Sequence, residues 1–262
     1  MQDLKHLFTP NKAIHGSTFM ALCAIQGAAA LAVWSLASSP VLPVPMEILR
    51  AWLRLIREGG FGTEVMTSTL LACQAVGLTF VVALVMSYAT VLPFFRPLGH
   101  LVSKMRFLSL VGLSFVFTLM MHGGHNLKVS LLVFGMVVFF VTSMVEEINA
   151  IPSEALAHAR TLGMSEWRVV WEVIILGRID RAFEVLRQNF AVAWMMLTMV
   201  EGISRAEGGV GALLLNQNKH FHMDAVFAIQ LTILLIGVGM DYAFGVAKRF
   251  FFPYADLALE AR

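Results

Sequence analysis

Two carboxylates lie inside runs of apolar residues, where an ionised group is costly and commonly functional. Glu201 closes one apolar run and Asp241 lies within another, so each is a candidate for a binding or conducting role. Structural alternatives exist for both. Glu201 can be a helix-end residue that reaches the outer interface, or it can pair with Arg205, which lies four residues further along the same helix face. Asp241 can pair with Lys248 or Arg249 near the end of its run.

Other residues that could carry chemistry favour structural interpretations. His122 and His125 flank two glycines, and such a pair without a nearby cysteine or carboxylate is typical of a polar turn. Glu146 and Glu147 are adjacent, so they point to different helix faces and cannot act as a paired acid and base. The glycine-rich segment 208–211 does not fit GxxxxGK[ST], which occurs nowhere in the chain, and predicts a turn with positive φ. We therefore predict no catalytic residue, no metal and no cofactor bound by this chain.

The composition is that of an integral membrane protein. Hydrophobic residues make up 58% of the 262 residues and charged residues 14%, with a mean hydropathy of +0.76, whereas soluble domains are about 25% charged. The formal net charge of +2 and the scattered basic residues argue against nucleic acid as a partner. Cys23 and Cys73 lie in apolar runs and are expected to be buried thiols outside any disulfide framework.

The apolar runs predict an all-α membrane protein with about six transmembrane helices in a single domain, residues 1–262. Such a helix needs about 20 apolar residues. The expected spans are about 17–36, 64–92, 107–121, 127–145, 190–200 (or from 183) and 225–247. For the first run, a cleaved signal peptide is the alternative to a span. The third run is short, which predicts either a tilted helix that starts near Lys104 or a broken helix.

An amphipathic helix is predicted between the first two spans. In the segment MEILRAWLRLIREGG, apolar residues recur at helical spacing against charged ones, and Gly59 and Gly60 end the pattern. The apolar positions are Ile48, Leu49, Trp52, Leu55 and Ile56. We expect this helix to lie along the membrane interface.

The distribution of basic residues predicts that both termini are cytoplasmic. With the N-terminus inside, the inner segments hold more Lys and Arg than the outer segments, as membrane topology requires. The inner set is Lys5, Lys12, Arg96, Lys104, Arg106, Arg160, Arg168, Arg178, Arg181, Arg187, Lys248, Arg249 and Arg262; the outer set is Arg50, Arg54, Arg57, Lys128, Arg205 and Lys219. The polar segment 152–173 is then cytoplasmic.

This polar segment predicts two short helices joined at a glycine. Ser153 is expected to cap the first helix and Gly163 to end it in a left-handed conformation. Ser165 is expected to cap the second helix, which continues towards 176. Ala155 and Ala159, four residues apart, form a small-residue face that permits close approach of another backbone. The alternative is an amphipathic surface helix with no partner.

The order Glu154, Ala155 and then Gly163 resembles the cytoplasmic EAA loop of bacterial ABC importer permeases. Segments 41–77 and 194–244 are similar to the entry and the end of the nitrate, sulfonate and taurine branch of that family. The resemblance implies a type I ABC importer permease fold with cytoplasmic coupling helices in an EAA-type loop, residues 152–176. One departure is that 176–179 reads Leu-Gly-Arg-Ile, where the family usually has a Leu-Pro pair and a further Pro.

The resemblance also implies a function. The chain would be the permease subunit of an importer that moves a small solute (nitrate, sulfonate, taurine, bicarbonate or a related organic molecule) across the bacterial inner membrane by alternating access. ATP and Mg would be bound by a cytoplasmic ATPase partner. A second permease copy in a homodimer, a periplasmic or lipid-anchored substrate-binding protein and membrane lipid are the other expected partners.

Two sets of site residues are expected, the first of them implied by the resemblance. The ATPase-coupling residues would be Ser153, Glu154, Ala155, His158, Ala159, Arg160, Leu162, Gly163 and Met164. The candidates for the translocation path are Glu201, Trp194, Met195, Thr198 and Gln74. An ion-coupled secondary transporter is the alternative, although no convincing internal repeat is found. A membrane-embedded enzyme would need a denser set of acid, base or ligand residues.

Overall fold

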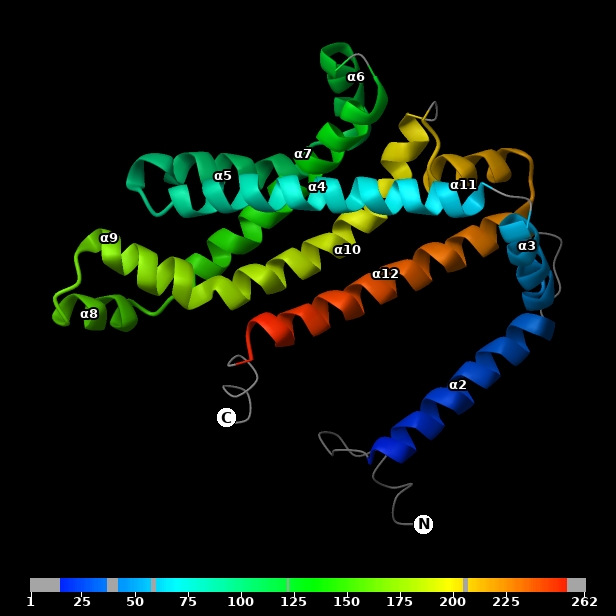
Figure 1. Cartoon of the computed structure of the whole chain (residues 1–262), viewed down its shortest axis with the longest axis horizontal. Coiled ribbons are helices and arrows are strands. Elements are labelled where there is room, and N and C mark those ends of the chain that lie inside the picture. The colour runs from blue at the N-terminus through cyan, green and yellow to red at the C-terminus, as the bar shows by residue number, and fades with distance from the viewer. Residues whose placement is uncertain (1–14, 37–41, 58–59, 122, 205–206, 254–262) are drawn as a thin grey trace.

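The computed structural model is a helical protein, and it describes residues 15–36, 42–57, 60–121, 123–204 and 207–253 (Figure 1). Short 3-10 segments lie at Pro93–Phe95 (η1), Met105–Phe107 (η2) and Leu176–Arg178 (η4), and a π-helix spans Val170–Ile175 (η3). The α-helices are α2 (Gly16–Leu36), α3 (Pro45–Arg57), α4 (Phe61–Ala89), α5 (Arg96–Lys104), α6 (Leu110–Met121), α7 (Gly124–Asn149), α8 (Ser153–Thr161), α9 (Glu166–Val169), α10 (Ile179–Ile203), α11 (Val210–Lys219) and α12 (Met223–Phe251).

Four helices in the described part of the chain are long and apolar enough to cross a membrane: α2, α4, α7 and α12. A fifth is added if Pro93–Phe107 and Leu110–Met121, which meet at 109°, form one broken span. This bend supports the broken form of the third predicted span over the tilted one. The predicted fifth span lies within α10, which is long enough at 25 residues but carries several charges in its first half. The count of six spans stays a prediction.

Helices α4, α7 and α10 form the core. The side chains of Leu71 and Ala75 on α4, Leu131 on α7, and Ala193 and Leu197 on α10 are at most 2% exposed and belong to one cluster. A second cluster joins α4, α5, α7 and the first half of α10 further along the bundle. Helices α4, α7 and α10 each contribute to both clusters, and α7 has the most buried residues of the three, so it is the central helix of the bundle.

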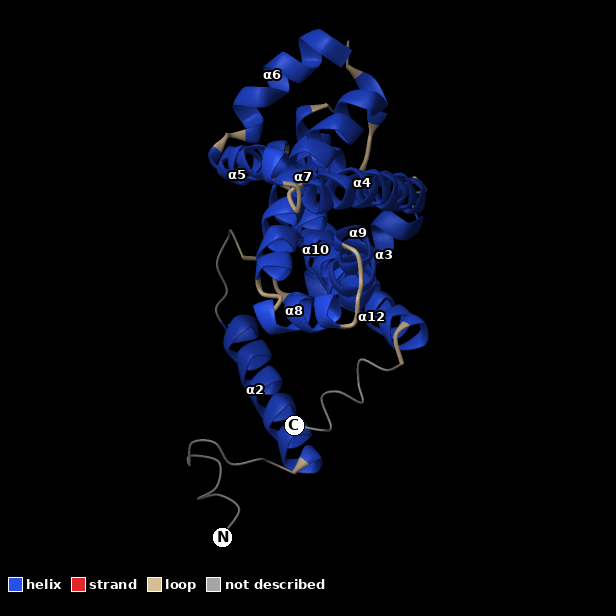
Figure 2. Ribbon diagram, turned by 90° about the vertical axis from the view of Figure 1, so that its left-hand side faces the viewer, coloured by secondary structure: helices blue, strands red, loops and turns tan. Residues whose placement is uncertain are grey.

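Much of the outer surface is apolar, as expected for helices that lipid would cover. No residue of α2 is buried, and this helix reaches the bundle near its C-terminal end, where Trp34 lies against Phe227 at 6.3 Å between ring centroids. Figure 2 shows α2 standing apart from the other helices. Cys23 and Cys73 are exposed, so the prediction of buried thiols is wrong for contacts within the chain. Their apolar surroundings are helix faces that protein does not cover.

Helix α3 is amphipathic, as predicted, but part of its apolar face packs against protein. Ile48 and Ala51 are buried in a cluster with Ala228 of α12. The Trp52 Nε1–H group donates a hydrogen bond to Thr232 Oγ1 at 2.9 Å. Two residues of the predicted apolar stripe, Leu49 and Ile56, are 46% and 52% exposed. One side of α3 therefore packs against α12, and the other side of its apolar face is not covered by protein.

The bundle has two distinct ends, which we call the hairpin end and the α11 end. Helices α8 and α9 lie at the hairpin end, and α3 and α11 lie at the opposite end (Figure 1). At the hairpin end, Lys248 Nζ and Glu184 Oε2 form an ion pair at 2.7 Å between α12 and α10. Basic residues assigned above to the cytoplasmic side lie at this end of the bundle, among them Lys248, Arg160 in α8 and Arg168 in α9. The orientation itself stays a prediction.

Candidate functional site

Helices α8 and α9 form a compact hairpin that projects from the membrane helices. Gly163 has φ +78°, so the predicted left-handed turn is present. Its N–H donates to Arg160 O at 2.9 Å, and Met164 N–H donates to Ala159 O at 3.3 Å. These two bonds satisfy carbonyl groups at the end of α8 that have no partner within the helix.

The predicted caps of the hairpin differ from those observed. Helix α8 starts at Ser153 itself, with Pro152 as its N-cap and no side-chain capping bond, so the prediction that Ser153 caps this helix is wrong. Pro152 has extended dihedral angles and takes the N-cap position, so α8 begins one residue earlier than predicted. Ser165 does occupy the N-cap position of α9, although its hydroxyl makes no capping bond.

An ion pair closes the hairpin across the glycine turn. The guanidinium of Arg160 donates to both carboxylate oxygens of Glu166, at 2.8 and 3.1 Å. This hydrogen bond lowers the pKa of the Glu166 carboxyl below its ordinary value. The contribution of the pair is therefore fully present above the ordinary pKa and is lost as the pH falls through the lowered one. Since both side chains are exposed, the pair contributes little energy and mainly orders the turn.

The surface of the hairpin combines charged and large apolar side chains. Glu154, His158 and Leu162 are exposed at intervals of four residues, so they share one face of α8. Ala159 is only 4% exposed, because the small-residue face predicted for a partner packs mainly inside the hairpin. Trp167 is 71% exposed on α9. An exposed aromatic residue beside a charged face is typical of a docking surface or a membrane interface.

The hairpin is joined to α10 by consecutive helical segments, with a break in the helical dihedral angles at Arg178 (φ −127°) just before α10. From Glu166 to Ile203, α9 leads through the π-helix η3 and the 3-10 turn η4 into α10. The predicted second helix of the loop is therefore an α-helix for only four residues, and it continues as the π-helix η3. Arg178 in η4 lies 3.9 Å from Glu147 at the end of α7. The hairpin is therefore connected to the helix that lines the groove described next.

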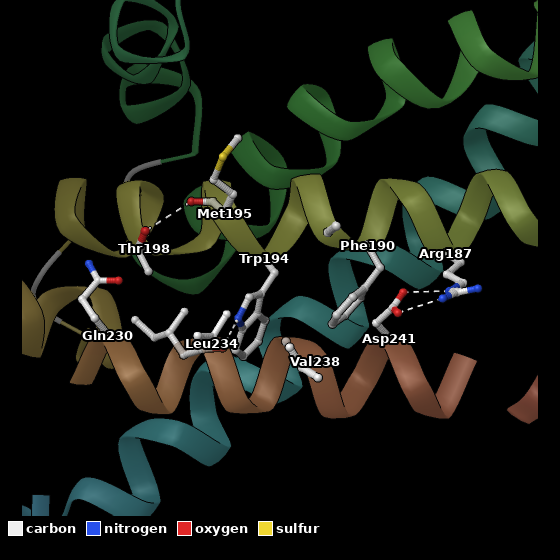
Figure 3. A pocket seen from close by; sticks show the side chains of 12 residues that line it. Arg187, Phe190, Trp194, Met195, Thr198, Gln230, Leu234, Val238 and Asp241 are labelled. Carbon is white, nitrogen blue, oxygen red and sulfur yellow. Dashed lines mark hydrogen bonds and ion pairs between the residues drawn. The ribbon is translucent and has the colours of Figure 1, made fainter. Parts of the chain in front are cut away.

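A groove of about 580 Å³ lies between α10 and α12. Three of the predicted path residues line it: Trp194, Met195 and Thr198 (Figure 3). From α12, Gln230 and Leu234 face the same space. The groove has apolar walls with a few polar groups, as ligand sites commonly do.

Two interactions set the shape of this groove. Trp194 Nε1–H donates to Ile233 O at 2.8 Å, which fixes the indole against α12, and Phe190 stacks on it at 6.0 Å between ring centroids. At the hairpin end of the groove, Arg187 donates to both oxygens of Asp241, at 2.7 and 2.8 Å (Figure 3). The expected partners of Asp241 on its own helix are therefore wrong, because a guanidinium on the neighbouring helix α10 faces it directly.

The other two path candidates lie elsewhere. Gln74 on α4 is hydrogen-bonded through Oε1 to His125 Nε2 at 2.8 Å and does not line the groove. Glu201 is 0% exposed and lies beyond the groove, at the α11 end of α10. Arg205, its expected ion-pair partner, falls outside the described residues. A role for these two side chains in a path stays a prediction.

Glu201 belongs to a buried polar network that holds the first turn of α11. Its Oε2 accepts the N–H of Gly211 at 2.7 Å, and its Oε1 accepts the hydroxyl of Ser68 at 2.5 Å. The Ser68 Oγ in turn accepts the N–H of Val210 at 2.8 Å. Glu64 accepts the N–H of Gly209. Three N–H groups that have no partner within the helix are thereby satisfied by side chains of α4 and α10.

Helix α7 contributes the cation of this network. Lys128 is 2% exposed and donates from Nζ to Gly208 O at 2.8 Å. Gly208 and Gly209 have φ values of +68° and +106°, so the positive-φ turn predicted for this segment is confirmed. Ser68, Glu64 and Lys128 were not predicted as members of this network. The signal that could have pointed to it is Lys128, a lysine near the start of an apolar membrane helix.

We expect Ser68→Ala to destabilise the protein by about 2–3 kcal/mol, because it removes a buried acceptor and a buried donor at once. Ser87→Ala is the matched control, since Ser87 is also buried on α4 but donates only to Ala83 O of the same helix. The control should lose less than about 1 kcal/mol. Thermal unfolding in detergent measures both variants. Equal losses would show that the network adds nothing beyond local helix bonding.

The described residues contain no group of three or more His, Cys, Asp or Glu side chains that could hold a metal ion. His125 is engaged with Gln74. His122, the other member of the histidine pair, lies outside the described residues.

Comparison with known proteins gives one similarity to a transport protein. The chain is 27% identical over 94 residues to a putative ABC transporter permease protein of Methanocaldococcus jannaschii. The aligned stretch covers 36% of this chain and only 35% of that protein. No protein-family model matches the chain. The similarity, together with the long apolar helices, indicates a multi-pass membrane protein that resembles an ABC transporter permease over about a third of its length.

Proposed function

We propose that this chain is the permease subunit of an ABC importer in a bacterial cytoplasmic membrane. The observation that carries the proposal is the direct connection between a protruding hairpin and the groove: α9, which contains Glu166, leads through the short segments η3 and η4 into α10, which contains Trp194 of the groove. Displacement of the hairpin by a partner would therefore move one wall of the groove. The similarity to a putative ABC transporter permease supports the same function.

In this proposal the hairpin binds a separate cytoplasmic ATPase, which holds ATP and Mg. Closure of the ATPase pair would move α8 and α9 and thereby bias the helices between two packings, one open to each side of the membrane. The chain's own residues bind the ATPase, transmit the motion and line the path. This assigns the chain a transport role without catalytic residues.

The groove between α10 and α12 is proposed as half of the translocation path. Gln230, Arg187 and Asp241 are polar groups at an exposed face of membrane helices, where contact with lipid would be costly. A second copy of the chain that faces this groove would cover them and enclose the path. A small solute, delivered by a substrate-binding protein, would then pass between the two copies. Nitrate, a sulfonate, taurine, bicarbonate or a related small organic molecule are the proposed solutes.

The test is recovery of an ATPase by tagged protein in mild detergent, followed by mass spectrometry. We expect a P-loop ATPase with the wild-type chain and about tenfold weaker recovery with Glu154→Lys, equivalent to about 1.4 kcal/mol of binding free energy. Glu146→Lys is the matched control, because Glu146 is an exposed acid on α7 outside the hairpin. Its recovery of the ATPase should equal that of the wild type.

Two outcomes would contradict the proposal. Recovery of no ATPase by well-folded wild-type protein would favour the ion-coupled secondary transporter. Undiminished recovery by Glu154→Lys would remove the hairpin from the ATPase interface.

A further inference from the structure

One buried network joins four helices at the α11 end of the bundle. Glu64 and Ser68 come from α4, Lys128 from α7 and Glu201 from α10, and all of them converge on the turn that starts α11. Ser68 and Glu201 are each 0% exposed. The turn is therefore fixed to three long helices rather than resting on one.

The composition of this network is more than a helix cap requires. A single neutral Ser or Asn side chain is a sufficient N-cap for most helices. Here the carboxylate of Glu201 and the ammonium of Lys128 are withdrawn from water, with the half-buried Glu64 beside them, and burying charges is costly before pairing offsets it. Glu201 has both carboxylate oxygens engaged, with Oε1 facing α4 and Oε2 facing α11. Its side chain thus bonds α10 to both α4 and α11 at this end.

Glu201 lies at the end of α10 opposite the hairpin, so it can hold that end of the helix in place when the hairpin moves. The hairpin enters α10 at its N-terminal end, and Glu201 lies near its C-terminal end, about 33 Å away at 1.5 Å per residue. The groove residues Trp194 and Thr198 lie between these two ends. A force on one end of a free helix both shifts and tilts it. If the far end is held, the same displacement becomes tilt alone and moves the groove wall relative to the rest of the bundle.

We infer that Glu201 is the positioning residue that fixes the α11 end of α10, so that movement of the α8–α9 hairpin is converted into movement of the groove wall. This inference rests on the proposed permease function. It goes beyond that function because it assigns Glu201 to transmission of the motion and not to contact with the solute.

The experiment uses the full chain with its ATPase in liposomes and a reporter cysteine in the groove. Met195→Cys, in a background with Cys23→Ser and Cys73→Ser, places a thiol at a position that is 70% exposed. A maleimide measures its labelling rate without nucleotide and with ATP plus vanadate. With Glu201 intact, we expect the nucleotide to change this rate roughly tenfold, as a shift between two packings would do.

Glu201→Gln keeps the size of the side chain but replaces one acceptor oxygen by an amide donor. Because Glu201 is fully buried, that amide cannot turn to water. If it faces Ser68 it donates to Oγ, and the Ser68 hydroxyl loses its acceptor; if it faces Gly211, that N–H loses its acceptor. We expect the ATPase to copurify as before and the nucleotide response to fall below about twofold. Glu64→Gln is the matched variant. Glu64 is only half-buried, so the amide can face solvent, and we expect it to keep at least about half of the response.

Each result separates the inference from the proposed function. A response in Glu201→Gln equal to that of the wild type would overturn the inference, and a lower melting temperature with an unchanged response of the folded protein would do the same. Equal losses in Glu201→Gln and Glu64→Gln would also overturn it, because the effect would then belong to the charge cluster as a whole. If Glu201→Gln does not fold, Ser68→Ala, which cuts the connection to α4, replaces it with the same expected loss. Failure of wild-type protein to bind any ATPase would defeat the proposed function and with it the inference.

Discussion

Gly211→Ala is expected to destabilise the protein by about 3 kcal/mol or more. A Cβ atom at Gly211 would lie 2.6 Å from Thr198 Cα and 2.9 Å from Thr198 C, both in the backbone of α10. Two main-chain segments cannot move apart here, because the network around Glu201 holds α11 against α10. Overpacking of this kind usually costs 1–3 kcal/mol where side chains can yield, and backbone yields less. Thermal unfolding in detergent measures the loss.

Gly239→Ala is the matched control for this substitution. Gly239 lies inside α12, and a Cβ atom there would meet no atom within 4 Å. Replacement of a helical glycine by alanine should then be neutral or stabilise the helix by about 0.5–1 kcal/mol. If Gly211→Ala loses less than about 1 kcal/mol, the close approach of α10 and α11 is not what holds this end of the bundle.

Gly163→Pro is expected to abolish binding of the ATPase while leaving the membrane helices folded. The observed φ of +78° is inaccessible to proline, which is fixed near −65°. The substitution also removes the N–H that donates to Arg160 O. A loss of about 3 kcal/mol in the hairpin corresponds to a population of the native turn that is roughly a hundredfold lower. Copurification with the ATPase measures the effect, and thermal unfolding measures the bundle.

Gly163→Asn provides the control at the same position. Asparagine adopts the left-handed region more readily than other residues with a Cβ, and no atom lies within 4 Å of a Cβ placed here. This variant should retain most of the binding. Wild-type recovery of the ATPase by Gly163→Pro would refute the role of the turn in coupling. Loss of bundle stability in the same variant would show that the hairpin is not an independent docking element.

The helical fold class and the positions of the glycine turns were predictable from local sequence patterns. The long apolar runs predicted α2, α4, α7 and α12, and the glycine positions predicted the left-handed turn at Gly163 and the turn at 208–209. These features depend on composition and on the conformational freedom of single residues. Helix boundaries were less predictable, as the start of α8 at Ser153 illustrates.

The partners of charged side chains were not predictable in the same way. Asp241 was expected to pair along its own helix, but it pairs with Arg187, which lies 54 residues earlier in the chain. For Glu201, the pattern along its own helix offered Arg205, which lies outside the described residues, and gave no sign of its described partners Ser68, 133 residues earlier, and Gly211. A pattern within one helix gives the neighbours three and four residues away and contains no information about which face of another helix packs against it.

Hydropathy, helix propensity and glycine turns act over a few residues, so they identify a helical membrane protein with a polar hairpin from the chain alone. How these elements are combined depends on long-range packing. The fold places the hairpin, the groove and the buried network along one helix, α10, with Glu201 in the network beyond the groove. The physical reason is packing between helices. The close approach of Gly211 to α10 and the burial of Lys128 bring together groups from four helices that are far apart in the chain.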